Sequence, residues 1–341
     1  MKLAIHDSQS GFHPQWVEYC KLNNIKYKIV DCYANNIITQ LNDCNGLMWH
    51  FSQSNSKDIV IAKQILFALE HTGYKMFPNF KTAWTFDDKV AQKYLLEAID
   101  APIVPSFAFY DKSQALKWVS KTNFPKVFKL RGGAGSANVR LVKNKREANY
   151  LIKKSFGKGF TQYEGWSNLK ERLRKYKRGK TGLKDVAKGI VRLWYPPYYS
   201  KIIGRERGYI YFQEFIPNNN SDTRIILIDS KAFALKRMVR KGDFRASGSG
   251  ECYYGKDEFD ERCVKLAFEI NKKIESQCIA YDFVFDQNKS PLIVEISYGF
   301  IPSVYRDCPG FWDEQLNWHE GKFRPEDWMV QTIIKQIKGH V

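Results

Sequence analysis

Two carboxylate residues near the end of the chain, Asp282 and Glu295, have the type and spacing of a metal site. They lie 13 residues apart, inside the apolar runs AYDFVF and LIVEIS. The intervening turn residues predict a hairpin that places the two side chains on adjacent strands. An unpaired carboxylate within an apolar strand is costly, so the pair predicts a shared Mg²⁺ ion. The alternative is two surface charges on a half-exposed strand.

A glycine-rich loop, RGGAGS at residues 131–136, directly follows the apolar strand KVFKL. Glycines allow backbone N–H groups to approach and surround phosphate oxygens, and Lys129 in the preceding strand could add a positive charge. The loop is no P-loop, because no Gly-Lys-Ser/Thr follows it. An ordinary turn between two strands would explain this glycine-rich loop equally well.

Three arginines, Arg224, Arg237 and Arg245, fall on or just after a predicted hairpin that begins with DTRIIL. Side chains on neighbouring strands can line one cleft and stabilise phosphoryl charge. The alternative is a solvated basic face.

The elements expected to position these residues form an α/β protein of three segments. Residues 1–84 alternate short apolar strands with amphipathic helices, which predicts a small parallel sheet. In the helical pattern of residues 58–71, Ile59, Ala62, Ile65, Leu66 and Leu69 predict the apolar face. Residues 85–212 contain a helix that starts near Asp87 or Asp88, the glycine loop and a basic insertion at 158–207. Residues 213–341 predict antiparallel strands that carry the metal pair.

The charge and composition restrict the class of protein. The chain has 341 residues, a net charge of +18 and seven scattered cysteines without a C-x-x-C pair. Neither a disulfide framework nor a structural zinc site is indicated, and no apolar run is long enough to span a membrane. The expected location is the cytoplasm. The insertion holds 14 Lys/Arg against 4 Asp/Glu, which indicates attraction to an acidic partner.

Taken in order, these motifs resemble the ATP-grasp superfamily, in particular glutathione synthetase, D-alanine-D-alanine ligase and the glutamate-adding ligases. The resemblance implies a parallel-sheet domain (1–84), a lid subdomain (85–212) and a C-terminal antiparallel-sheet subdomain with the metal site (213–341). It implies ATP and Mg²⁺ as cofactors, with Asp282, Glu295 and Ser297 as metal ligands. Arg224, Arg237 and Arg245 would act on the acyl phosphate. The implied ATP-binding residues are Lys89, Lys129, Gly132, Gly133, Gly135, Ser136, Gln213, Glu214, Phe215, Ile216 and Asp222.

One position departs from the family pattern. The family usually has Glu-x-Asn at the last metal strand, whereas this chain has Glu295-Ile296-Ser297. A serine hydroxyl is a weaker and shorter metal ligand than an amide oxygen. Ser297 therefore leaves open whether one or two Mg²⁺ ions bind.

The implied reaction joins a carboxylate to an amine through an acyl phosphate, with release of ADP. The sequence of the tail, from EISYGF to LNWHEG, resembles that of ATP-grasp proteins that accompany surface-polysaccharide synthesis. This favours a uronate-containing glycan as the carboxylate and an amino acid or other amine as its partner. Ligation to a peptide or protein terminus is one alternative. A nucleotide- or nucleic-acid-binding module without ligase activity is another, although nucleic acid is not the expected partner.

Overall fold

The computed structural model describes residues 1–339, except 9–10, 54, 133–137, 162, 164, 178, 180, 196, 241 and 247–249. The chain forms two compact units. The first unit comprises residues 1–86, 94–103 and 216–341, and the second comprises 87–93 and 104–215. The predicted segment 1–84 and residues 216–341 thus fall in the first unit, together with 85–86 and 94–103. The second unit contains residues 87–93 and 104–212 of the predicted segment 85–212, and also residues 213–215.

The N-terminal part of the first unit is a four-stranded parallel sheet of order β2-β1-β3-β4. Its connections are helical, as the alternation of apolar runs predicted. The strands are β1 (Lys2–His6), β2 (Lys26–Val30), β3 (Gly46–Met48) and β4 (Lys75–Phe77), and the helices are α1 (His13–Leu22), α2 (Ile37–Gln40), α3 (Ser56–His71) and α4 (Phe80–Ala83).

Helix α3 buries fewer of its apolar residues than its pattern predicted. Ala62, Leu66 and Leu69 are buried and Ile65 is partly buried, but Ile59 is exposed. The side chain next to it, Asp58, is buried instead. The prediction for Ile59 was wrong because a hydrogen-bonded carboxylate takes part of the inward-facing side in the first turn of the helix.

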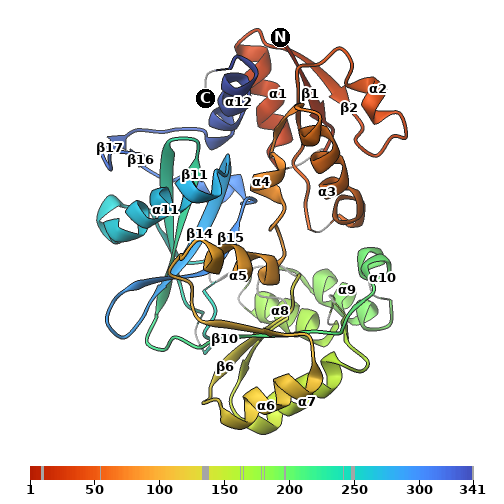
Figure 1. Cartoon of the computed structure of the whole chain (residues 1–341), viewed down its shortest axis with the longest axis vertical. Helices are drawn as coiled ribbons and strands as arrows, with labels where there is room; N and C mark the ends of the chain where they lie inside the picture. Colours follow the sequence, from red (N-terminus) through yellow and green to blue (C-terminus); the bar gives the residue numbers. More distant parts are fainter. Residues whose placement is uncertain are drawn as a thin grey trace. The chain divides into compact units, whose positions relative to one another are not determined.

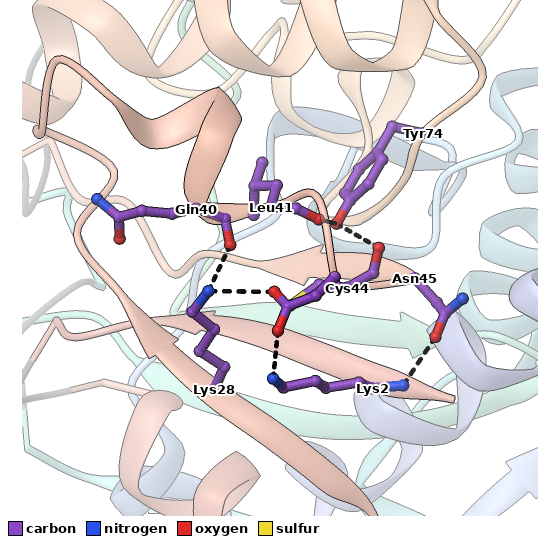
Figure 2. Close-up of polar contacts among 8 residues, drawn as sticks. Lys2, Lys28, Gln40, Leu41, Cys44, Asn45 and Tyr74 are labelled. Atoms are coloured by element: carbon purple, nitrogen blue, oxygen red, sulfur yellow. Dashed lines mark hydrogen bonds and ion pairs between the residues drawn. The ribbon is translucent and has the colours of Figure 1, made fainter.

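A polar network secures the segment between α2 and β3 (Figure 2). The carboxylate of Asp43 accepts hydrogen bonds from the amines of Lys2 at 2.5 Å and Lys28 at 3.1 Å. The Tyr74 hydroxyl donates to the carbonyl of Cys44 at 3.1 Å. Lys2 and Lys28 belong to β1 and β2, so the network ties this segment to two strands of the sheet.

The C-terminal part of the first unit is a seven-stranded antiparallel sheet of order β15-β14-β11-β12-β16-β17, with β13 paired to β12. Its strands are β11 (Ser221–Ile228), β12 (Lys231–Met238), β13 (Cys252–Tyr253), β14 (Cys278–Phe285), β15 (Pro291–Ser297), β16 (Gly310–Asp313) and β17 (Trp318–Glu320). Its helices are η1 (Lys256–Glu258), α11 (Glu261–Ile274), η2 (Pro302–Tyr305) and α12 (Pro325–Ile337).

Both faces of strand β11 are covered, which explains its continuous apolar run. Ile225 and Leu227 join the core beneath α11, whereas Ile226 and Ile228 join the core shared with the N-terminal sheet. Helix α12 contributes Trp328 and other residues to that shared core and lies beside α1 (Figure 1). The aromatic tail therefore packs largely as core.

The second unit is built on a four-stranded antiparallel sheet of order β5-β10-β6-β7. Helices α6 and α7 pack side by side against it (Figure 1). The strands are β5 (Ser106–Phe109), β6 (Lys126–Lys129), β7 (Val139–Val142) and β10 (Ile210–Glu214), and the helices are α6 (Lys112–Lys121) and α7 (Lys145–Ser155). The predicted parallel N-terminal sheet and antiparallel C-terminal sheet are confirmed.

The basic insertion forms three helices framed by a two-stranded sheet. The strands are β8 (Phe160–Thr161) and β9 (Arg205–Glu206), and the helices are α8 (Gly165–Lys177), α9 (Leu183–Trp194) and α10 (Tyr198–Ile203). Helix α5 (Lys89–Ala98) starts after Asp88, whose carboxylate caps it by accepting from the Ala91 N–H at 3.0 Å. Its first residues belong to the second unit and its remainder to the first.

Candidate functional site

An alternating set of guanidinium and carboxylate groups lies across three strands of the C-terminal sheet. The register pairs Asp222 with Arg237 and Arg224 with Asp282. Arg224 donates to both oxygens of Asp282, at 2.5 and 2.7 Å, and Arg237 donates to both oxygens of Asp222, at 2.7 and 2.6 Å. A further ion pair at 3.0 Å joins Arg237 to Asp282. We call these four residues the charge ladder.

The charge ladder keeps Asp282 ionised. Burial would by itself raise the pKa of this carboxyl group, but the charges of Arg224 and Arg237 outweigh burial and hold the pKa well below its ordinary value. The bidentate geometry adds directional hydrogen bonds to the charge attraction. Asp282 is therefore a permanent anion at neutral pH.

Glu295 lies directly across from Asp282 in the β14–β15 register, as the hairpin predicted. A bulge follows this pair, between Asp282 and Phe283. Bulges redirect side chains and are common beside functional sites. Ser297 faces Ala280 on the same hairpin, and its hydroxyl interacts with the backbone of Gly299, at 3.1 Å from the carbonyl and 3.2 Å from the N–H.

Arg245 lies in the loop after β12 rather than on the sheet. Its guanidinium donates to both oxygens of Asp243, including a contact of 2.6 Å. The described contacts thus do not join Arg245 to the charge ladder. Tyr305, which the sequence reasoning missed, does face the ladder: burial raises its pKa to about 12, against the opposing effect of Arg224 and Arg237. No periodic pattern in the sequence of the tail distinguishes Tyr305 from its neighbours.

The second unit contains two buried lysines that the sequence predicted as nucleotide ligands. Lys89 is the first residue of α5, and Lys129 is the last residue of β6, just before the glycine loop. Lys89 and Lys129 are 4% and 5% exposed. The Lys129 amine donates to the Gln213 side chain at 2.6 Å, and the amide of Gln213 donates to the Ser106 hydroxyl at 3.1 Å. Buried amines are costly without anionic or polar partners. Two such lysines are the property expected of a site for an anionic ligand.

The remaining predicted nucleotide residues lie near the end of β10. Gln213 and Glu214 are the last residues of that strand, and Phe215 ends the second unit. Glu214 forms an ion pair of 2.7 Å with Lys126, a buried lysine that the motif reading missed. Ile216 begins the C-terminal part of the first unit.

The base of the glycine loop is held by one residue at the end of the insertion, Glu206, and one just after it, Tyr209. The Tyr209 hydroxyl accepts from the Arg131 N–H at 2.7 Å, and the Glu206 carboxylate accepts from the Gly132 N–H at 3.2 Å. Tyr209 also donates to Glu206. Gly133, Gly135 and Ser136 lie outside the described residues, so their predicted role stays a prediction.

A cavity of about 650 Å³ opens at the carboxyl ends of the parallel strands. In the sheet, β2 lies on one side of β1 and β3 lies on the other, so the strand order reverses at β1. Open parallel sheets bind ligands at the carboxyl ends of their strands, at such a switch point. The lining comes from segments following β1, β2 and β3 and from residues after β15: His6, Asp7, Ser8, Gly11, Gln15, Tyr33, His50, Ser52, Asn55, Asp58, Phe300, Ile301, Pro302, Ser303 and Arg306.

Two histidines line this cavity, and one of them has a defined protonation state. The Phe12 N–H donates to Nδ1 of His50 at 2.9 Å, and the Cys32 N–H donates to Nδ1 of His6 at 3.1 Å. Because a backbone N–H can only donate, we infer that the neutral His50 ring carries its proton on Nε2. Nδ1 of His6 also lies 3.3 Å from the carbonyl oxygen of Val30, an acceptor, so these two contacts do not select one tautomer of His6. Burial lowers the pKa of both histidines, that of His50 to about 4, so His50 is neutral at physiological pH. The cavity thus contains one neutral imidazole with a defined donor, His50.

Comparison with known proteins finds a family that part of the chain resembles. Residues 199–299 match the RimK-like ATP-grasp domain. The alpha-aminoadipate–LysW ligase LysX of Saccharolobus solfataricus is 20% identical over 295 residues, covering 83% of this chain and 89% of that protein. The RimK domain ATP-grasp protein of Sphaerobacter thermophilus superposes with a TM-score of 0.58 at 11% identity, over 98% of this chain and 100% of that one. The chain thus has the ATP-grasp fold, and residues 199–299 are similar to the RimK-like ATP-grasp domain.

Both sequence matches agree with the predicted class, an ATP-grasp ligase. A third structure has a nucleotide and metal bound. The biotin carboxylase domain of Hydrogenobacter thermophilus 2-oxoglutarate carboxylase, with MgADP, superposes with a TM-score of 0.57 at 12% identity, over 98% of this chain and 69% of that one. That structure therefore holds a nucleotide together with magnesium in the same fold.

The carboxylates of this ATP-grasp chain fit a magnesium ion. Among the described residues, no cluster of three acidic, histidine or cysteine side chains could hold a metal. Mg²⁺ does not require one, because it usually takes one or two carboxylates and fills its shell with phosphate oxygens and water. Of the roughly four lone-pair positions of a carboxylate, the arginines occupy three at Asp282. One position of Oδ1 remains, on the residue that pairs with Glu295 in the strand register.

Replacing Ser297 with asparagine should leave ADP formation equal to or above that of the wild type. An asparagine side chain can accept the backbone N–H two residues later, as the serine hydroxyl does from Gly299, and it adds an amide oxygen. Steady-state ADP release measures the effect. Ser297→Ala serves as the comparison because it removes the turn contact. Complete loss in Ser297→Asn would show that the hydroxyl has a role of its own.

Proposed function

We propose that this protein is an ATP-dependent ligase that joins a carboxylate to an amine through an acyl phosphate. The observation that carries the proposal is the charge ladder, which aligns Arg224 and Arg237 with an ionised Asp282 on one sheet face of an ATP-grasp fold. Such fixed positive groups can stabilise phosphoryl charge at little reorganisation cost.

The proposed reaction has two steps. A substrate carboxylate attacks the γ-phosphorus of ATP, which forms an acyl phosphate and releases ADP. The amine then attacks the acyl carbon, phosphate leaves, and the nitrogen loses a proton as the amide forms. Arg224 and Arg237 would balance charge on the transferring group, while Lys89, Lys129 and the backbone of the glycine loop would hold the phosphates. A bound Mg²⁺ would supply further charge neutralisation, with Asp282 and Glu295 as its protein ligands and Ser297 as a possible third.

The adenosine part of ATP would contact the segment Gln213 to Ile216. Glu214 or Asp222 would reach the ribose. Asp222 is held by both nitrogen donors of Arg237, which makes Glu214, with side-chain exposure of 30%, the more accessible of the two. Arg245 would act from the loop after β12.

The cavity at the switch point is the proposed substrate pocket. Its far wall, from Phe300 to Arg306, follows the metal strand within a few residues. The neutral imidazole donor of His50 and Arg306 suit the oxygens of a carboxylate-bearing or hydroxylated substrate. An acidic sugar such as a uronate, joined to an amino acid or another amine, remains our favoured pair. A peptide or protein terminus is the second candidate, supported by the LysW ligase relative.

A screen of carboxylate and amine pairs by ADP and phosphate release tests this function. Equal amounts of ADP and phosphate that require both substrates would support it. Activity with uronate-containing glycans but not with peptides would favour the first substrate class, and the reverse result the second. ATP binding without ADP release for any pair would instead favour a nucleotide- or nucleic-acid-binding module.

The pocket is tested by replacing Gly11 with alanine. Gly11 has φ +70°, and an added Cβ would lie 1.9 Å from Nδ1 of His50. The variant should therefore displace that ring and raise the KM for the substrate in this pocket. Gly73→Ala is the matched control, because Gly73 has φ +80° but no atom within 4 Å of its added Cβ. Equal KM values in the two variants would contradict the pocket assignment.

A further inference from the structure

The basic insertion has an unusual surface on helix α9 that the ligase reaction does not explain. Leu183, Val191 and Trp194 are 66%, 56% and 70% exposed, and Ile190 is exposed as well. These residues recur at three-, four- and seven-residue spacing, which places them on one side of the helix. We call Leu183, Ala187, Ile190, Val191 and Trp194 the apolar stripe.

The side of α9 next to the apolar stripe already has its packing partner. Val186 and Gly189 are the buried residues of the helix. A Cβ added to Gly189 would lie 3.1 Å from Leu169 of α8, which shows how closely the two helices approach. Arg172 of α8 also pairs with Asp185 of α9. The apolar stripe is therefore separate from the face of α9 that packs against α8.

Positive charges border the apolar stripe. At 100° per residue, Lys184, Lys188 and Arg192 occupy the arc next to Val191, on the side away from the buried face. All three are exposed. The aromatic residues Tyr195, directly after α9, and Trp166, at the start of α8, are also exposed.

The apolar stripe and the positive charges beside it together indicate one kind of partner. An acidic polysaccharide would match the charges, but it offers no apolar interior to cover Leu183, Ile190 and Val191. A lipid bilayer with anionic headgroups offers both, and amphipathic helices with Lys/Arg beside Trp and Leu lie in such interfaces. Trp and Tyr side chains prefer the headgroup level. None of the helices that the structure describes is long and apolar enough to cross a bilayer, so the contact would be peripheral.

We propose that the apolar stripe and basic arc of α9 dock the protein onto the surface of an anionic membrane. The stripe inserts at the boundary of headgroups and acyl chains, and the surplus of positive charge in residues 158–207 attracts the surface. This inference is independent of the ligase reaction. It places the enzyme at a membrane surface without a membrane-spanning segment.

Vesicle co-sedimentation of the full chain tests the proposal. The wild type should bind vesicles that contain phosphatidylglycerol and bind pure phosphatidylcholine vesicles much less. Replacing Lys184, Lys188 and Arg192 with glutamine should weaken the partition coefficient on the order of a hundredfold, because each cation near an anionic surface contributes roughly fivefold. The control is the same replacement of Lys112, Lys117 and Lys121, which are exposed on α6 of the same unit.

A second variant separates insertion from simple charge attraction. Ile190→Ser with Trp194→Ser should reduce binding about tenfold or more, whereas Tyr150→Ser, an exposed aromatic on α7, should have little effect. Thermal unfolding would verify that each variant is folded. Undiminished binding of the Ile190/Trp194 variant would overturn the proposal in favour of charge attraction alone. Failure to bind phosphatidylglycerol vesicles, with stripe-dependent binding to an acidic polypeptide such as polyglutamate, would overturn it in favour of a protein partner.

Discussion

Asp282→Asn is expected to reduce ADP formation to about one thousandth of the wild-type rate or less, the scale of losing a preorganised charge interaction in a catalytic site. It should also lower the free energy of unfolding by about 3–5 kcal/mol, because removing one partner of a buried ion pair leaves the other charge uncompensated. Asp282 receives hydrogen bonds from Arg224 and forms an ion pair with Arg237. Steady-state ADP release and urea unfolding measure the two effects.

The stability part of this result depends on pH with a defined sign. The folded-state pKa of Asp282 lies below its ordinary value, which is about 3.9 in an unfolded chain. Its contribution to stability is therefore fully present above that unfolded value and is lost as the pH falls through the lower folded-state value. The difference in unfolding free energy between wild type and variant should be constant near neutrality and shrink only below about pH 4.

A double variant separates the structural and catalytic roles of Asp282. Arg224→Met with Asp282→Asn removes both members of the bidentate pair and leaves Arg237 with Asp222. It should recover part of the lost stability, because a removed pair costs less than a broken one. It should recover none of the ADP formation. ADP release near the wild-type rate in either variant would contradict the role of Asp282 in the metal site.

Lys129→Met is expected to remove most of the stabilisation that ATP confers on the folded protein. Lys129 is almost completely buried, and its amine donates to Gln213 on the neighbouring strand β10. A ligand that binds only the folded state raises the unfolding temperature according to its concentration relative to its Kd. Loss of a charge contact with phosphate should weaken ATP binding on the order of a hundredfold.

Thermal unfolding with and without a nonhydrolysable ATP analogue measures this effect. The comparison within each variant cancels any change that the substitution makes to intrinsic stability. Lys117→Met is the control, because Lys117 is exposed on α6 of the same unit. An undiminished ATP-induced shift in Lys129→Met would remove this lysine from the nucleotide site.

Local spacing was informative where neighbouring residues in the chain also interact in space. The distance from Asp282 to Glu295, with turn residues between them, was enough to place the two carboxylates across from each other on a hairpin. A helix start near Asp87 or Asp88 was predicted for the same reason, and Asp88 is the residue that caps the helix, by contacting an N–H three residues away. Helical periodicity was less reliable for α3, where it could not show that the buried Asp58 would bond to Tyr33.

The partners of Asp282 could not be read from the sequence. Arg224 is 58 residues from Asp282 in the chain, and their contact depends on the order in which β14, β11 and β12 pair. The cavity likewise joins segments near residues 6, 33 and 50 with residues 300–306. No local pattern specifies such a combination, because it depends on how two sheets share one core.

The sequence by itself determined the parallel and antiparallel sheets, the hairpin with Asp282 and Glu295, and the ATP-grasp order of motifs, because each depends on short-range spacing. Only the tertiary structure decided that two arginines hold Asp282 as an anion, that a polar cavity opens at the switch point, and that an apolar side of α9 stays uncovered. These features depend on which surfaces pack together. The metal-site carboxylates and their function as ligands remain a prediction, now with a defined geometric neighbourhood to test.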